Sequence, residues 1–382
     1  NQSSKAMAMY DRLNSEYKNS VFIPKSLLRQ GLAYYNESQN EQALSKFKKV
    51  AKEYPSSEDA IQAVSTARLI YIDLGRVDEY AAWVKTLDYV NVTDADLDNT
   101  TYLAAEKQYL DNNTDNAIKQ FNNYLSSFPN GIHALKSHFY IAQLYSKKAL
   151  PENAQPHYEY VVNKPKSEFT EQSLVKLSET YLNASQWNKA IPLLKRLESE
   201  ADYPQNITYA QSNLMNAYYQ LSKYNEAEAY AEKVLASSKI DNKVKSDAQI
   251  IIARSAIKTN NETKAKSAYA EVEKIATGAL AAEALFYNAY FKNKEGKYEA
   301  SNTTIQKLAK DYSSYKYYSA KGLVVMAKNF YALKDAFQAT YILESVINNF
   351  SEFDDVVTEA QAELKKIKTE EAKTNSSITT EN

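Results

Sequence analysis

The chain has 382 residues, and its six glycines and eight prolines are too few for a turn-rich β fold. Its 46 basic and 47 acidic residues give a net charge of −1 without a basic run, which argues against nucleic acid as the principal partner. The lack of cysteine excludes disulfides and thiolate metal sites, and no apolar stretch approaches the ~18 residues of a membrane-spanning helix.

The first predicted element is a helix near the N-terminus, where Ala6, Tyr10, Leu13 and Tyr17 fall at helical spacing. This segment matches only the second helix of the repeated unit described next. We therefore expect residues 1–20 to be the second helix of a repeat whose first helix is missing, and the chain to be the C-terminal piece of a longer array.

Between residues 21 and 352 the chain repeats with a period of about 37 residues. The clearest mark is one residue, usually small, early in the second helix of each unit, and successive marks lie 35 to 39 residues apart. This regularity predicts about nine tandem helix-turn-helix units. In chain order the marks are Ala6, Ala43, Tyr80, Ala117, Ala154, Ala190, Ala227, Ala265, Ala300 and Ala339.

Other positions keep the same register within each unit. Small residues allow two antiparallel helices to approach closely, and large residues fill the space that remains. The units that begin at residues 61 and 281 match least well, since Tyr80 replaces the small residue in one and Thr304 an apolar residue in the other. The unit 24–57 matches best, with Leu27, Gly31, Tyr34, Ala43, Phe47, Val50 and Pro55 in order.

This pattern of large, small and aromatic positions resembles the tetratricopeptide repeat. The resemblance covers nearly the whole chain and implies an all-α fold, a right-handed α-solenoid of helix hairpins with a concave groove lined by the first helices. The second helices end in segments such as "FKKVAKEYPSS" (47–57) and "FNNYLSSFPNG" (121–131). These are similar to the bacterial cell-envelope branch, the Tol–Pal-associated periplasmic proteins and the lipoproteins of outer-membrane assembly.

The C-terminal region differs from the repeats. Residues 353–367 place Val356, Val357, Ala360 and Leu364 on one face and charged residues on the other, which predicts a capping helix. Residues 368–382 are polar and have almost nothing to bury, so we expect a disordered tail.

Candidate binding residues follow from the resemblance, because positions 2, 5, 9 and 12 of the repeat face the groove in that family. Tyrosine is abundant, with 32 residues, and it combines a large contact area with a polar group. An Asn-, Lys- and Tyr-rich genome would also scatter tyrosines without a binding role. The expected groove residues are Tyr35, Tyr102, Glu106, Tyr109, Phe139, Gln143, Tyr209, Asn216, Tyr219, Arg254, Lys328 and Tyr331.

No catalytic motif, phosphate-binding loop or metal-ligand pattern is present in the sequence. His138 falls at a packing position, so we interpret it as a core or partly exposed histidine and not as a ligand. We predict a non-enzymatic scaffold without cofactor or metal that binds a protein or peptide in its groove.

Two functional alternatives stay open, a carbohydrate or small-ligand module and the regulatory arm of a larger protein. The resemblance implies a periplasmic or outer-membrane-associated location, and a cytoplasmic location is the alternative.

Overall fold

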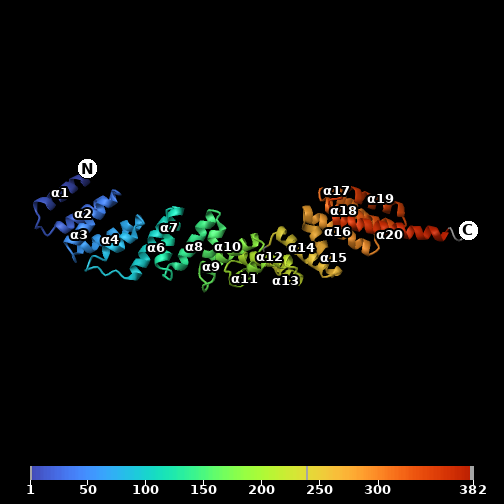
Figure 1. The fold of residues 1–382 in the computed structure, drawn as a ribbon, viewed down its shortest axis with the longest axis horizontal. Helices are drawn as coiled ribbons and strands as arrows, with labels where there is room; N and C mark the ends of the chain where they lie inside the picture. Colours follow the sequence, from blue (N-terminus) through green and yellow to red (C-terminus); the bar gives the residue numbers. More distant parts are fainter. Residues whose placement is uncertain (1, 238–239, 379–382) are drawn as a thin grey trace. The chain divides into compact units, whose positions relative to one another are not determined.

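A computed structural model describes residues 2–237 and 240–378 of the chain. Within these residues there are twenty α-helices and no strand, which confirms the predicted all-α fold, an α-solenoid of antiparallel helix hairpins. The chain divides into two compact units, residues 1–180 (unit 1) and 181–382 (unit 2). In each unit the helices succeed one another in chain order (Figure 1).

Unit 1 holds nine helices and most of a tenth, which runs across its boundary. They are α1 (Gln2–Glu16), α2 (Ile23–Asn36), α3 (Asn40–Glu53), α4 (Glu58–Asp73), α5 (Val77–Val84), α6 (Asp94–Leu110), α7 (Thr114–Ser127), α8 (Ala134–Lys147), α9 (Pro151–Val162) and α10 (Thr170–Asn183).

Unit 2 holds the rest. They are α11 (Trp187–Glu200), α12 (Pro204–Gln220), α13 (Tyr224–Ala236), α14 (Asn242–Lys258), α15 (Glu262–Ile275), α16 (Gly278–Lys294), α17 (Tyr298–Asp311), α18 (Lys316–Ala332), α19 (Ala336–Asn349) and α20 (Asp354–Ile378).

Within each unit the even-numbered helices are the first helices of hairpins and the odd-numbered helices that follow them are the second, from α2–α3 to α8–α9 in unit 1 and from α12–α13 to α18–α19 in unit 2. Successive second helices begin 36 to 38 residues apart, close to the predicted period. The small marks sit where close approach requires them: Ala43, Ala117 and Ala190 are fully buried. The repeat therefore reflects the contact between the two helices of a hairpin.

One mark of the predicted series is wrong. Ala300 is exposed, and its neighbour Ser301 is buried and donates a hydrogen bond from Oγ to the carbonyl oxygen of Ala289, 2.8 Å away. With this shift of one residue, Ile305 fills the apolar position that Thr304 seemed to break. Ala6 is exposed on α1, which packs on α2, and its place in the repeat series stays a prediction.

The turn inside each hairpin uses a left-handed residue. The backbone N–H of the following residue donates to a carbonyl five positions back, as in Gln39 to Tyr34 and Arg76 to Tyr71. The residues with positive φ at these turns are Ser38, Gly75, Asn112, Ala149, Ser185, Ser222, Asn260, Gly296 and Lys334. Only two of them are glycine, so the scarcity of glycine hid the turns from sequence analysis.

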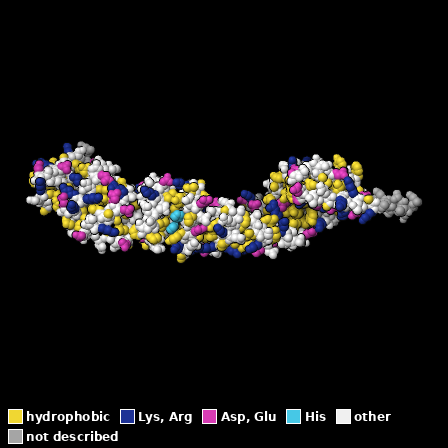
Figure 2. All heavy atoms as spheres, in the orientation of Figure 1, with side chains coloured by type: hydrophobic (Ala, Val, Ile, Leu, Met, Phe, Trp, Pro, Cys, Tyr) yellow, Lys and Arg dark blue, Asp and Glu magenta, His cyan; other side chains and the backbone are white. Residues whose placement is uncertain are grey.

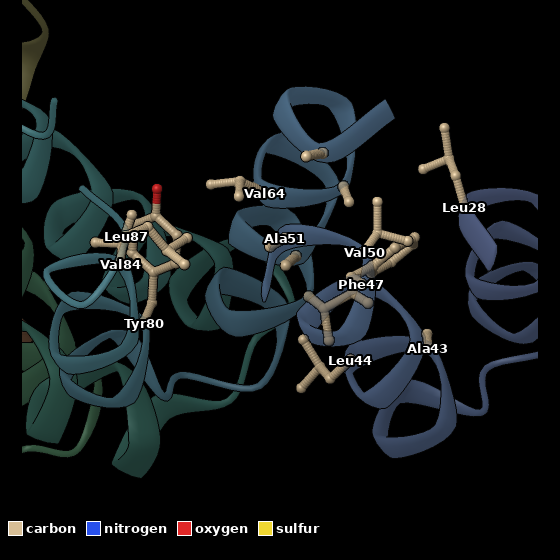
Figure 3. Close-up of a cluster of buried hydrophobic side chains, with 14 of the residues drawn as sticks. Leu28, Ala43, Leu44, Phe47, Val50, Ala51, Val64, Tyr80, Val84 and Leu87 are labelled. Atoms are coloured by element: carbon tan, nitrogen blue, oxygen red, sulfur yellow. The ribbon is translucent and has the colours of Figure 1, made fainter. Parts of the chain in front are cut away.

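The core of unit 1 is a band of aliphatic and aromatic side chains between successive helices. Its largest cluster joins side chains from α2, α3, α4 and α5, many of which are drawn in Figure 3. Phe47 and Val50 of α3 are fully buried in it, and Tyr80 and Val84 of α5 extend it toward α6.

The C-terminal helix α20 is longer than predicted. Val356 and Ala360 are fully buried against α18 and α19, as expected for a helix that covers the last hairpin. The helix continues beyond residue 367 to Ile378, so the predicted disorder from residue 368 is wrong up to that point. Its backbone hydrogen bonds continue through the polar sequence, and residues 379–382 lie outside the described part of the chain. No helix among the described residues has the length and apolar character needed to cross a membrane.

Candidate functional site

In unit 1 the first helices of successive hairpins lie side by side and form what we call the first-helix surface. α2 packs on α4 and α4 on α6, while hydrogen bonds join α6 to α8 and α8 to α10. Residues three or four positions apart share one face of each helix. The surface consists of Tyr35 of α2, Ile61 and Leu69 of α4, Glu106, Tyr109 and Leu110 of α6, and Gln143 and Lys147 of α8.

Four of the six groove residues predicted in unit 1 lie on this surface, half-buried: Tyr35, Glu106, Tyr109 and Gln143. The hydroxyl of Tyr35 donates to Oδ2 of Asp73 at 3.2 Å and so links α2 to α4. Burial, together with this carboxylate, raises the pKa of Tyr35, which keeps the hydroxyl a donor at neutral pH.

The other two, Tyr102 and Phe139, are core residues and not groove contacts. Their exposed fractions are 2% and 5%. The ring of Tyr102 stacks on His133 with centroids 3.9 Å apart, and that of Phe139 lies 4.7 Å from Phe169. The fifth position of the repeat is covered here because aromatic residues at the start of the next first helix lie over it.

Glu106 is held by two neighbours at the edge of that core. Its Oε1 accepts hydrogen bonds from the Tyr102 hydroxyl at 2.6 Å and from Nζ of Lys136 at 3.0 Å. Although burial opposes it, these two donors lower the pKa of Glu106. The same ammonium lies 5.4 Å from the Tyr102 ring centroid. This carboxylate is therefore occupied within the protein, and its role is to join α6 to α8.

Tyr109 forms a fixed aromatic wall on the surface. Its ring stacks on that of Tyr140, with centroids 4.3 Å apart and planes 12° from parallel. Its hydroxyl donates to Oε1 of Gln143 at 3.0 Å, and the amide of Gln143 donates to Gln172 at 3.4 Å. Tyr109 and Gln143, two of the predicted groove residues, are thus in contact, and both are ordered before any partner arrives.

A pocket of about 250 Å³ opens beside this wall, where the α6–α7 turn meets the end of α8. Leu110 has 68% of its surface exposed, although it is a large apolar residue. The pocket is lined by Tyr109, Leu110, Asn112, Thr114, Gln143, Leu144 and Lys147.

Sequence analysis missed Leu110 and Lys147 because it considered only the four groove positions of the family's repeat. Each of the two follows the last of those positions in its unit by one residue. The available signal was a leucine at the end of a predicted first helix, directly after the groove residue Tyr109.

In unit 2 three of the predicted groove residues are engaged in contacts within the unit. The guanidinium of Arg254 donates to both carboxylate oxygens of Glu283, at 2.9 and 2.6 Å. Lys328 pairs with Glu359 at 2.6 Å, and the hydroxyl of Tyr331 donates to Glu370 at 2.8 Å. These contacts join α14 to α16 and α18 to α20.

The carboxylate of Glu283 is 4% exposed and also accepts hydrogen bonds from the hydroxyls of Tyr269 and Tyr318, at 2.9 and 2.7 Å. Burial opposes ionisation, but the donors outweigh it and lower the pKa of Glu283. Every oxygen of this buried acid has a partner, so the cluster holds helices together and leaves no group for chemistry.

The remaining predicted residues of unit 2 lie on α12: Tyr209 and Tyr219 are half-buried, and Asn216 is exposed. The side-chain amide of Asn216 donates to the carbonyl oxygen of Ser212 at 3.0 Å. Because these residues belong to a different unit from Tyr109 and Gln143, their place in one shared groove stays a prediction.

Two of the three histidines form a pair inside the α8–α9 hairpin. The Nδ1 atoms of His138 and His157 lie 2.8 Å apart, and the His138 ring stacks on Tyr160 at 3.7 Å. Burial, then the charges of His157 and Lys164, lower the pKa of His138 to about 4, and burial lowers that of His157. Histidine atoms are visible at the surface near α8 (Figure 2). This agrees with the predicted partly exposed packing role.

Among residues 2–237 and 240–378, no three or more His, Asp or Glu side chains are grouped so that they could hold a metal ion. The first-helix surface offers exposed apolar area, amide hydrogen bonds and one ammonium at the pocket.

Residues 25–57, the α2–α3 hairpin, match the sequence model of the tetratricopeptide repeat family. No curated protein sequence matches the chain. The chain is thus an α-solenoid in which the α2–α3 hairpin carries the family's sequence pattern.

Several solved structures are similar to the chain. The tetratricopeptide domain of P58(IPK) is 14% identical over 91% of this chain and 97% of its own, with a TM-score of 0.31. Yeast Tom70 is 12% identical over 97% of both chains, with a TM-score of 0.36. The C-terminal part of a repeat protein from Cytophaga hutchinsonii is 15% identical over 67% of this chain and 98% of its own, at 0.37.

Proposed function

We propose that the chain is a non-enzymatic scaffold and that the first-helix surface of unit 1 holds a protein partner. One observation carries the proposal: the large apolar side chains Ile61, Leu69 and Leu110 are 55%, 51% and 68% exposed on that surface. The second helices of unit 1 instead expose charged residues such as Lys48 and Lys119.

This difference between the two faces has a physical consequence. Fully burying an exposed leucine side chain against a partner contributes ~1.5–3 kcal/mol, whereas exposed lysines contribute little to affinity. The wall of Tyr109 and Gln143 adds a rigid contact whose ordering is complete before binding. A few such anchors dominate the affinity of most protein interfaces.

The test removes the apolar side chains and keeps the fold. We expect Ile61→Ser, Leu69→Ser and Leu110→Ser together to abolish photo-cross-linking of partners from extracts of the source organism, with helicity unchanged. The matched control is Phe337→Ser with Tyr341→Ser on α19 of unit 2, where the two side chains are 76% and 65% exposed. Partners lost equally from both variants, or from neither, contradict the proposal.

A small-ligand function is the second candidate, and a groove beside the short helix α5 favours it. This groove has a volume of about 840 Å³ and is bordered by Trp83, Tyr89, Lys48 and Lys52, within the range of ~300–1,000 Å³ that small-molecule sites occupy. A ligand there would quench or shift Trp83 fluorescence, and a glycan or metabolite library that leaves this emission unchanged argues against it.

The location in a bacterial cell envelope is also a proposal, supported by the resemblance of the second-helix endings at residues 47–57 and 121–131. Fractionation of the source organism, with one periplasmic and one cytoplasmic marker protein, tests it. Recovery of the chain with the cytoplasmic marker contradicts the proposal.

A further inference from the structure

The pocket at the α6–α8 edge carries an uncompensated positive charge. Two acids lie in the adjoining turn, and each already has a lysine: Asp111 pairs with Lys107 at 2.6 Å and Asp115 with Lys148 at 2.6 Å. Lys147, which lines the pocket, has no carboxylate within 4.0 Å among the described residues. An anionic group at the pocket would therefore meet an ammonium that no acid of the described chain neutralises.

Apolar and polar groups border that ammonium in a fixed arrangement. Leu110 exposes most of its side chain on one side, and the stacked ring of Tyr109 stands beside it. Asn112 and Thr114 add hydrogen-bonding groups from the turn. The backbone of Asn112 is left-handed, with φ of 59°, and its N–H donates to the carbonyl oxygen of Tyr109 at 3.1 Å.

The size of the pocket indicates that it holds one side chain of a partner and not a whole small-molecule ligand. At about 250 Å³ it is smaller than the range of ~300–1,000 Å³ that drug-sized molecules occupy. A single aliphatic side chain from a longer segment suits this volume, and its backbone would lie across the polar rim where Gln143 and Asn112 offer amides. A carboxylate next to that side chain would reach the end of α8 and Lys147.

We propose that this pocket binds a peptide segment of the partner in which an aliphatic residue lies next to an acidic residue. The aliphatic side chain packs on Leu110 and Tyr109, and the carboxylate pairs with Lys147. The inference rests on the proposed function and specifies the partner's chemistry at one place on the first-helix surface.

Random dodecapeptides displayed on phage provide the probe. Selection against the full chain should enrich sequences with Leu, Ile or Val within two residues of Asp or Glu. Synthetic versions are then titrated by fluorescence anisotropy at low and high salt. We expect Lys147→Glu to weaken binding about tenfold at low salt and to reverse the salt dependence, because an attraction becomes a repulsion that ions screen.

Two further variants separate the apolar from the electrostatic contribution. We expect Leu110→Ser to weaken binding about tenfold at both salt concentrations, because apolar burial is not screened by ions. The control Lys119→Glu makes the same charge change on the exposed face of α7 and should alter binding less than twofold. An equal loss in Lys119→Glu and Lys147→Glu reduces the effect to net charge and overturns the inference.

The outcomes distinguish failure of this inference from failure of the proposed function. Peptides that depend on Leu110 but carry no acidic residue and are insensitive to Lys147→Glu overturn the inference and leave the scaffold proposal standing. Two other outcomes contradict the inference and the proposed function together. One is peptide binding that survives Leu110→Ser, Lys147→Glu and the double variant Ile61→Ser with Leu69→Ser. The other is a selection that enriches no sequence at all.

Discussion

Two neighbouring hairpins of unit 1 show how strongly the size of one residue affects the packing of the two helices. In the α2–α3 hairpin Gly31 and Ala43 occupy the two small positions, and a Cβ on Gly31 would come within 2.4 Å of the Phe47 ring. Both helices are 14 residues long and pack closely. In the α4–α5 hairpin the equivalent positions hold Arg68 and Tyr80, and α5 has only eight residues.

The larger residues change what the second hairpin can do. Tyr80 is 4% exposed and fills the space between the helices together with Tyr71 and Trp83, whose ring centroids lie 6.0 and 6.4 Å from its own. Arg68 turns away and donates from Nε to Oγ1 of Thr100 in the next hairpin, at 2.8 Å. The groove of about 840 Å³ beside Trp83 lies where a longer α5 would continue. Small residues thus allow the two helices of a hairpin to approach closely. Where they are replaced, aromatic residues such as Tyr80 stabilise the hairpin by filling the space between its helices.

The largest expected effect comes from removing the aromatic ring that fills the space between α4 and α5. Tyr80→Ala should lower the free energy of unfolding by ~3–5 kcal/mol, because a buried ring is removed and the short α5 cannot close the cavity. Urea denaturation followed by circular dichroism measures it. If the variant is as stable as the parent, α4 and α5 can approach as closely as α2 and α3, and the comparison fails.

Replacing a small residue by a large one in the neighbouring α2–α3 hairpin should destabilise the protein less. Ala43 is fully buried, so Ala43→Leu should overpack the contact between α2 and α3. We expect this to lower the free energy of unfolding by ~1–3 kcal/mol. Ala117→Leu should behave alike in the α6–α7 hairpin, and Ala300→Leu, at an exposed position, should change the melting temperature little. Unchanged melting of both buried variants would show that the small residues are not at the contact.

The α8–α9 hairpin extends the comparison from residue size to protonation. Because burial lowers the pKa of both His138 and His157, the unfolded chain binds more protons, and stability must fall as the pH drops below the unfolded value of ~6.5 toward about 4. The two Nδ1 atoms cannot both carry a proton at 2.8 Å. The charges of His157 and Lys164 also lower the pKa of His138.

We expect a loss of ~1–2 kcal/mol between pH 7 and pH 4.5, a range that allows for solvent screening of these half-buried rings. His138→Gln with His157→Gln should flatten the pH profile of urea stability. His133→Gln, outside the pair, should flatten it less. A profile that the double variant leaves unchanged would remove the pair from the explanation.

The smallest effect concerns the two turns. Ser38 closes the α2–α3 turn with φ of 59°, and Gly75 closes the α4–α5 turn with φ of 65°. Left-handed backbone costs ~1 kcal/mol for a residue with a Cβ, so Ser38→Gly should stabilise by up to about that amount. Gly75→Ser should destabilise by slightly more, because its Cβ would meet Nε2 of Gln120 at 2.9 Å. Melting temperatures that move in the same direction for both would contradict this account.

The sequence by itself determined the features that lie within one hairpin. The period, the all-α fold and the burial of Ala43, Ala117 and Ala190 follow from helical spacing and residue size, both of which are local. The same reasoning failed by one residue at Ala300, where two small residues are adjacent and only packing distinguishes Ala300 from Ser301.

Only the tertiary structure decided what neighbouring hairpins do to each other. It buried Tyr102 under His133, engaged Arg254 with Glu283 and left Leu110 and Lys147 at an open pocket. These outcomes depend on the rotation and offset of one helix against others that lie about 20 to 40 residues away in the chain. A sequence pattern specifies which face of a helix is apolar, but the neighbour's position determines how much of that face is covered.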